Sequence, residues 1–176
     1  MLKMLIRPQT GEYAPHFEPY IQMAPEGELV AFLEEQPKRL REKWAGISEE
    51  QANYRYAEGK WSVKEVIGHI ADTERVMQYR LLRIARGDTT PLSGFDEELF
   101  ARHAGFDRQS MEEIVKGFEI VRESTLALVR QLDDEAWARM GNVADFPASA
   151  RAFAYIIAGH AEHHVRILSE RYAAQV

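Results

Sequence analysis

The sequence predicts an all-α protein, a four-helix bundle with an irregular N-terminal arm. Apolar residues recur at helical spacing in four long stretches, at about residues 27–46, 62–86, 110–132 and 149–173. Two of these stretches begin with a capping box, in which a serine and a glutamate three residues later satisfy each other's backbone amides. There is no strand-like alternation and no internal repeat. These observations favour a single domain over residues 1–176, with its helices packed around one core.

The arm and the first helix differ in their proline content. Residues 1–25 hold four prolines with aromatic residues between them, so we expect an irregular segment that lies across the surface. The stretch 27–46 has apolar residues at helical spacing, but it contains Pro37. Proline removes a backbone donor inside a helix, and we therefore expect the first helix to bend or break there.

The second helix has the clearest boundaries. It begins at the capping box Ser62–Glu65, and Gly87 is expected to end it. One stripe along this helix is almost wholly apolar: Val66, His69, Ile70, Thr73, Met77, Leu81 and Ile84. His69 is therefore predicted to face the core.

The third and fourth helices follow a long connector. Residues 87–108 include a short helical patch at 96–103 and are long enough to cross the whole bundle, so the topology stays open on this pattern alone. The third helix begins at the capping box Ser110–Glu113, and the fourth, at about 149–173, buries His160 and His164 on its apolar face.

The histidines indicate a metal site. Positions i and i+4 lie about 40° apart around a helix and roughly 6 Å along it, so His160 and His164 can reach one ion. Two desolvated imidazoles side by side each need a polar partner, which a shared metal provides. With His69 they would form a three-histidine set with an open coordination position, as in catalytic zinc sites. A lone His69 would more often be a hydrogen-bonded core residue.

Neighbouring polar residues have competing interpretations. His163 points away from the pair and is expected at the rim, outside the ligand set. Asp72 and Glu74 could orient a ring N–H of His69, or could be solvated helix charges. Trp61, just before the helix cap, is expected to act as a hydrophobic staple or lid.

Two known helical metal motifs are absent from the sequence. The segment 160–164 lacks the glutamate that the zincin motif has at its second position, which argues against a metalloprotease. No histidine has a glutamate three residues before it, which argues against a di-iron site.

Composition limits the classes of partner. The net charge of −6 and pI near 5.6 argue against nucleic acid and favour a small-molecule substrate. The chain has no cysteine, so any thiol chemistry needs an external thiol. We expect no membrane partner and a cytoplasmic protein, because we find neither a spanning stretch nor a signal-peptide core.

Three segments resemble the DinB family of the YfiT type, often labelled metal-dependent hydrolases. They are WSVKEVIGHIADTE (61–74), GDTTPLSGFDE (87–97) and AGHAEHH (158–164). The resemblance covers nearly the whole chain and implies a four-helix bundle of up-down-down-up topology that is commonly a homodimer. It also implies one divalent metal held by His69, His160 and His164. Zinc and nickel are the leading candidates, since imidazole-rich sites suit both.

The resemblance also implies an activity. Family members with an assigned reaction mostly use a low-molecular-weight thiol of the bacillithiol type, so we expect such a thiol to be transferred to a small electrophile. Two alternatives stay open: a metal-dependent hydrolase that activates water, and a noncatalytic module in which the metal only joins helices.

Overall fold

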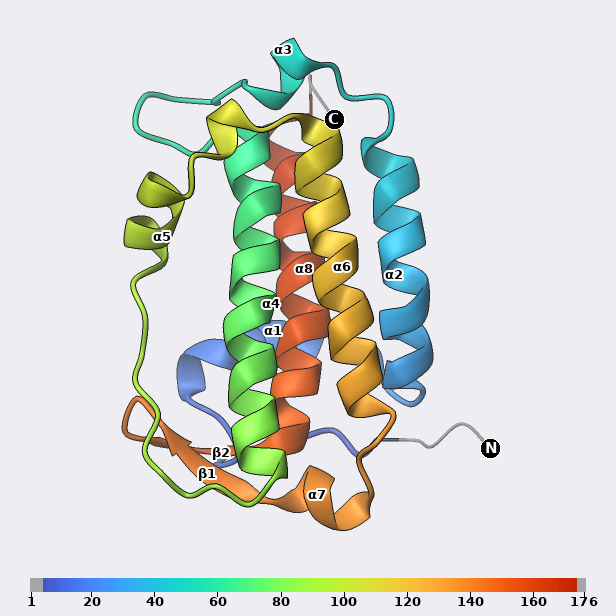
Figure 1. Ribbon diagram of the computed structural model, residues 1–176, viewed down its shortest axis with the longest axis vertical. Helices are drawn as coiled ribbons and strands as arrows, with labels where there is room; N and C mark the ends of the chain where they lie inside the picture. Colours follow the sequence, from blue (N-terminus) through green and yellow to red (C-terminus); the bar gives the residue numbers. More distant parts are fainter. Residues whose placement is uncertain (1–4, 174–176) are drawn as a thin grey trace.

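The computed structural model describes residues 5–173, and four long helices form its body (Figure 1). They are α2 (Leu29–Trp44), α4 (Val63–Ala85), α6 (Met111–Val129) and α8 (Ala150–Arg171). Each predicted boundary lies within three residues of the observed one. In Figure 1 α2 and α8 run upward, whereas α4 and α6 run downward. The predicted up-down-down-up four-helix bundle is therefore confirmed.

Short elements connect and flank the bundle. The chain from α4 to α6 passes along one side of it, so that both helices start at the same end (Figure 1). The short elements are η1 (Pro15–Phe17), α1 (Glu18–Met23), α3 (Glu49–Ala52), α5 (Glu97–Ala104), η2 (Phe106–Arg108), α7 (Asp134–Ala138), β1 (Met140–Val143) and β2 (Phe146–Ser149).

Local signals explain where the long helices begin and end. Ser62 and Glu65 form the predicted capping box of α4, and Ser110 and Glu113 form that of α6. After α4, Gly87 adopts a φ of +82°, a left-handed conformation that glycine tolerates at a helix end.

Of the two outcomes expected at Pro37, a bend or a break, the break is wrong, because α2 continues from Leu29 to Trp44. A proline in a helix leaves the carbonyl four residues earlier without its usual donor. Here that carbonyl belongs to Leu33, and it accepts a hydrogen bond of 3.1 Å from Nη1 of Arg122 on α6. A side chain distant in sequence thus compensates for the missing backbone donor.

The expectation of an irregular arm is also wrong in part. Pro15 and Pro19 stand in the first turns of η1 and α1, where proline is well tolerated. Helix α1 packs against α8, and Ile21 is fully buried. A Cβ on Gly159 of α8 would lie 1.8 Å from the Tyr20 carbonyl oxygen, so this close approach requires glycine.

The expected absence of strands is corrected by a small hairpin. Strands β1 and β2 pair antiparallel, with Met140 opposite Ser149 and Val143 opposite Phe146. The turn residues Ala144 and Asp145 both have positive φ, which suits a two-residue hairpin turn. Each strand has only four residues, too few to display a clear alternation.

The core contains apolar side chains and a buried ion pair between α4 and α6. The carboxylate of Glu74 on α4 accepts hydrogen bonds from Nε and Nη2 of Arg122 at 2.8 and 2.9 Å, and from the hydroxyl of Thr125 at 2.7 Å.

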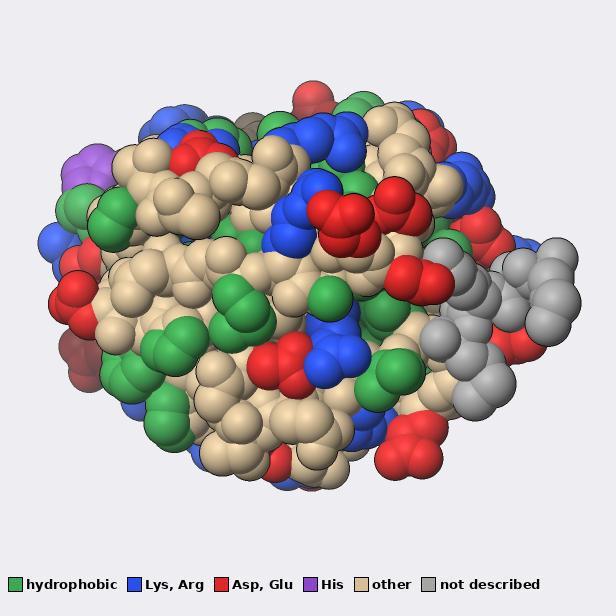
Figure 2. Space-filling view, turned by 90° about the horizontal axis from the view of Figure 1, so that it is seen from below, with side chains coloured by type: hydrophobic (Ala, Val, Ile, Leu, Met, Phe, Trp, Pro, Cys, Tyr) green, Lys and Arg blue, Asp and Glu red, His purple; other side chains and the backbone are tan. Residues whose placement is uncertain are grey.

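The surface charge and the helix hydropathy relate to the expectations from composition. At the end of the molecule that carries the hairpin, acidic and basic side chains are interspersed (Figure 2). Among residues 5–173, no helix is long and apolar enough to span a membrane.

Candidate metal centre

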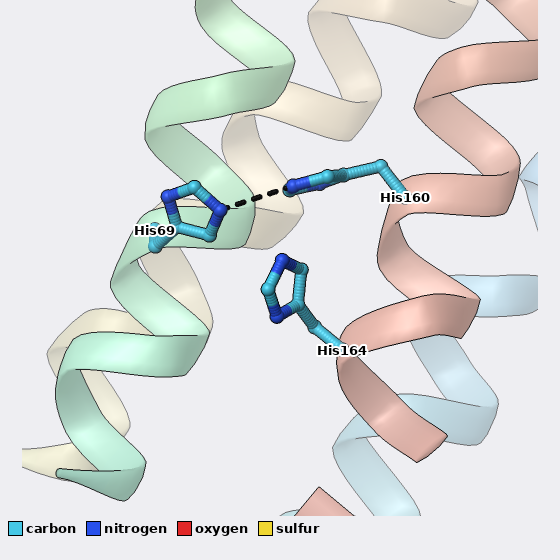
Figure 3. Close-up of side chains that lie close together, drawn as sticks. All are labelled: His69, His160 and His164. Atoms are coloured by element: carbon cyan, nitrogen blue, oxygen red, sulfur yellow. Dashed lines mark hydrogen bonds between the residues drawn. The ribbon is translucent and has the colours of Figure 1, made fainter. Parts of the chain in front are cut away.

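The three predicted histidines come together between α4 and α8 (Figure 3). One potential ligand atom from each of His69, His160 and His164 lies within 4.8 Å of the others. Nε2 of His69 and Nε2 of His160 are 3.0 Å apart, and the ring centroids of His160 and His164 are 4.5 Å apart. The two histidines of α8 converge, as their spacing predicted, and meet a third from the neighbouring helix α4.

Burial keeps these imidazoles neutral. It lowers the pKa of His69 to about 4 and that of His164 to about 2, with smaller contributions from neighbouring histidines. For the most deeply buried ring, His160, burial places the pKa well below the usual value of 6.5. Neutral imidazole is the form that ligates metals, so all three rings are ready to do so at neutral pH.

The arrangement fits a divalent metal ion. Two imidazole nitrogens on a tetrahedral zinc would be roughly 3.3 Å apart, close to the separation between His69 and His160. Among the described residues, no fourth histidine or carboxylate has a ligand atom within 4.8 Å of all three histidines, although Oε2 of Glu97 is 3.9 Å from Nε2 of His69. The set matches an open three-histidine site.

Other predicted residues fall into different places. His163 is half-buried beside the cluster and its ring packs on that of Tyr20, consistent with a position outside the ligand set. Asp72 pairs with Arg75, and Glu74 with Arg122, so neither carboxylate is hydrogen-bonded to His69. These pairings contradict the expectation that Asp72 or Glu74 orients the ring of His69. Glu74 is also not a solvated helix charge, because it is buried in an ion pair with Arg122.

The residues that do contact His69 lie elsewhere. The hydroxyl of Thr73, one turn further along α4, is 3.4 Å from Nδ1 of His69. The ring centroid of Trp61 is 4.7 Å from that of His69, so this residue flanks the site besides packing on the core. Oε2 of Glu97, on α5, is 3.9 Å from Nε2 of His69. The sequence pointed to Trp61 as a lid and placed Thr73 on the helix stripe of His69, whereas nothing in it indicated that Glu97 would lie beside this ring.

Two cavities reach the histidines from different sides. One, of about 560 Å³, extends from His160, Thr73 and Tyr20 toward Arg80 and Phe95. The other, of about 250 Å³, reaches His164 beside Trp61 and Tyr172. Glu97 lines both cavities, and burial together with the charges of Glu98 and Asp96 raises its pKa. The cluster is therefore accessible to small molecules.

Fold and site together define a helical bundle with a buried three-histidine cluster, and the sequence assigns it to a family. The sequence pattern of the DinB superfamily matches residues 33–168. The chain therefore belongs to the DinB superfamily.

Individual relatives agree with this assignment. The chain is 28% identical over 109 residues to "Putative metal-dependent hydrolase OB0413" of Oceanobacillus iheyensis, covering 61% of this chain and 62% of that protein. It is 22% identical over 129 residues to "Putative metal-dependent hydrolase YfiT" of Bacillus subtilis, covering 73% and 71%. A 32% identical match to a Geobacillus thermodenitrificans protein named "Putative metal-dependent hydrolase" covers 44% of this chain and 43% of that protein. The alignments thus span less than two thirds of two of these relatives.

A solved structure has the same fold. YfiT of Bacillus subtilis, described as a probable metal-dependent hydrolase with an unusual four-helix bundle topology, superimposes with a TM-score of 0.73. The match covers 96% of this chain and 94% of that one, at 19% sequence identity. At this identity the likeness concerns the fold.

Proposed function

We propose that this protein is a metal-dependent enzyme in which His69, His160 and His164 hold one divalent ion, zinc or nickel. The observation that carries the proposal is the convergence of three neutral imidazoles, two buried and that of His164 partly buried, at the ends of two cavities. An ion that only joined helices would be fully ligated by the protein and closed to solvent. The cavities favour an enzyme over such a module. The names of the relatives support a metal-dependent reaction.

A divalent ion in this site would supply Lewis-acid chemistry, lowering the pKa of a water or thiol that binds it. The protein's own residues would orient and shield the reactants. Thr73, near Nδ1 of His69, can fix the ring so that Nε2 faces the cluster. Trp61 covers one side of that ring and excludes water. Glu97 can accept a hydrogen bond from a substrate group in either cavity.

For the reaction, we propose transfer of a low-molecular-weight thiol of the bacillithiol type to a small electrophile. The absence of cysteine means that the thiol would come from the cosubstrate. The second candidate is metal-dependent hydrolysis, which the names of the relatives favour. We further propose a cytoplasmic homodimer that acts on a small molecule and binds neither nucleic acid nor membrane.

The metal is tested by elemental analysis of the purified protein. We expect about one divalent ion per chain, and we expect His160→Ala or His164→Ala to abolish most of it because two imidazoles cannot retain the ion. His163→Ala is the matched control, one residue away on the same helix, and should keep the ion. Equal loss in all three variants would contradict the assigned ligand set.

The reaction class is tested by two parallel screens of the metal-loaded protein. One supplies bacillithiol or glutathione with a halogenated nitroarene, and the other supplies ester and amide substrates. Conjugation that requires metal and disappears in His69→Ala would support thiol transfer. Hydrolysis without any thiol would support the second candidate instead, and inactivity in both screens would count against the enzyme.

A further inference from the structure

The larger cavity contains a buried cation that no carboxylate neutralises. Arg80, on α4, is only 4% exposed and lines this cavity together with His160. Nη2 of Arg80 donates to the carbonyl oxygen of Ser93 at 3.0 Å, and Nη1 lies 3.6 Å from the sulfur of Met77. Its guanidinium carbon is 5.4 Å from the ring centroid of Phe95. All of these partners are uncharged.

The other buried cations among the described residues each have a carboxylate partner. The ammonium of Lys64 lies 2.6 Å from a carboxylate oxygen of Glu49, and Arg122 is paired with Glu74. Within residues 5–173, no carboxylate oxygen lies within 4 Å of the Arg80 guanidinium. A buried charge without a counterion is costly, and arginine remains protonated despite burial. A bound anion would supply the missing partner.

The cavity suits an anion with an apolar body. Its lining includes the apolar side chains of Phe17, Met77, Phe95 and Val143, of which Met77 and Phe95 contact Arg80. Toward the histidine cluster it becomes polar, with Thr73 and Tyr20 beside His160. Arg80 follows Thr73 by seven residues on the same face of α4, about 10 Å along the helix axis. A ligand of that length could reach both ends.

We propose that Arg80 anchors a carboxylate group of the small-molecule substrate, whose apolar body fills the cavity toward the histidine cluster. The anchoring site exists whether or not metal is bound, but its assignment to the substrate rests on the function proposed above. A carboxylate carries one charge, whereas a phosphate ester carries nearly two. Since Asp96 and Glu97 line the same cavity, the smaller charge meets less repulsion.

Binding of small aromatic probes to the chelator-treated protein tests this directly, because a metal ion could itself bind a carboxylate. Benzoate, phenyl phosphate and benzyl alcohol share a ring and differ in charge. We expect benzoate to bind the wild-type protein more tightly than the other two. Arg80→Gln should weaken benzoate binding about tenfold to a hundredfold and leave benzyl alcohol unchanged, as a charge-assisted hydrogen bond is lost.

Two further variants complete the design. Arg75→Gln removes the same charge from an exposed position on α4, paired with Asp72, and should bind benzoate like the wild type. R80K keeps the charge without the paired N–H donors, so it should bind benzoate with intermediate affinity, and it tests the site if Arg80→Gln does not fold. Equal affinity of wild type and Arg80→Gln for benzoate, or equal affinity of wild type for benzoate and benzyl alcohol, would overturn the proposal.

Metal content and probe binding of the same variants distinguish the proposed carboxylate site from the proposed metal site. Tighter binding of phenyl phosphate than of benzoate would overturn the assignment to a carboxylate. Arg80→Gln should retain about one metal ion per chain, since Arg80 lies outside the histidine cluster. Metal loss in His160→Ala with benzoate binding intact would support both assignments. Arg80-dependent benzoate binding by a protein that takes up no metal would support the anion site and refute the metal site.

Discussion

Polar side chains buried between the helices differ in how they are satisfied. Glu74 and Arg122 satisfy each other, and Arg122 additionally donates to Leu33 and Gln36 on α2. The three histidines are held close together, with Nε2 of His69 3.0 Å from Nε2 of His160. The first group therefore stabilises the bundle, whereas the second is arranged for a ligand.

For these individual residues, we predict that Arg122→Gln lowers the free energy of unfolding by roughly 3–5 kcal/mol, because Glu74 would remain buried without its counterion. Urea denaturation of the wild type and the variant measures the difference. Arg130→Gln is the control, since Arg130 and Glu34 form an exposed pair that should contribute less than about 1 kcal/mol. Similar losses of unfolding free energy in both variants would contradict the argument that burial makes the Glu74–Arg122 pair more important for stability than an exposed pair.

Among the elements, α8 has the most demanding contacts. It carries two of the three histidines, packs against α4 and accepts α1 on another side. Tyr20 of α1 places its ring 5.2 Å from that of His160, so the position of α1 also shapes the larger cavity. The close approach at Gly159 makes this arrangement possible.

At the element scale we predict that Gly159→Ala displaces α1 and costs about 1–3 kcal/mol, in spite of the higher helix propensity of alanine. Thermal denaturation and hydrogen exchange of residues 18–23 would detect the change. Gly117→Ala on α6 is the matched control: a Cβ there meets nothing within 4 Å, so the variant should gain roughly 0.5–1 kcal/mol. A Gly159→Ala variant as stable as this control would contradict the packing argument.

For the whole molecule, the long connection between α4 and α6 determines what surrounds the cluster. It crosses the length of the bundle (Figure 1) and brings Phe95 and Glu97 to the cavities beside His160 and His164. The histidines themselves lie on α4 and α8, which run in opposite directions. An ion bound there would hold the two helices together.

At this scale we predict that metal removal destabilises the protein. A ligand that binds only the folded state at 100 times its Kd contributes about 2.7 kcal/mol, so chelation should lower Tm by several degrees, and added zinc or nickel should restore it. Calorimetry with and without chelator measures this shift. His164→Ala should show no such response, and a Tm of the wild type that is insensitive to chelator would argue against a tightly bound ion.

Sequence patterns alone identified the long helices and the histidine cluster. Capping boxes and apolar stripes are local, so they marked the starts of α4 and α6 and placed His69, His160 and His164 on inward faces. They could not indicate the direction of the helices, because a long connector permits either order. The family resemblance supplied the up-down-down-up topology and implied that the three histidines hold one divalent metal.

Tertiary structure decided the remaining features, since each depends on residues far apart in sequence. Pro37 is accommodated in α2 through Arg122, and α1 is seated at Gly159. Arg80 follows His69 by eleven residues, only about 20° around an ideal helix, so its face was predictable. The sequence could not show that, among residues 5–173, no carboxylate oxygen lies within 4 Å of its guanidinium. Whether a buried charge is neutralised depends on every element packed around it, and only the folded chain determines that set.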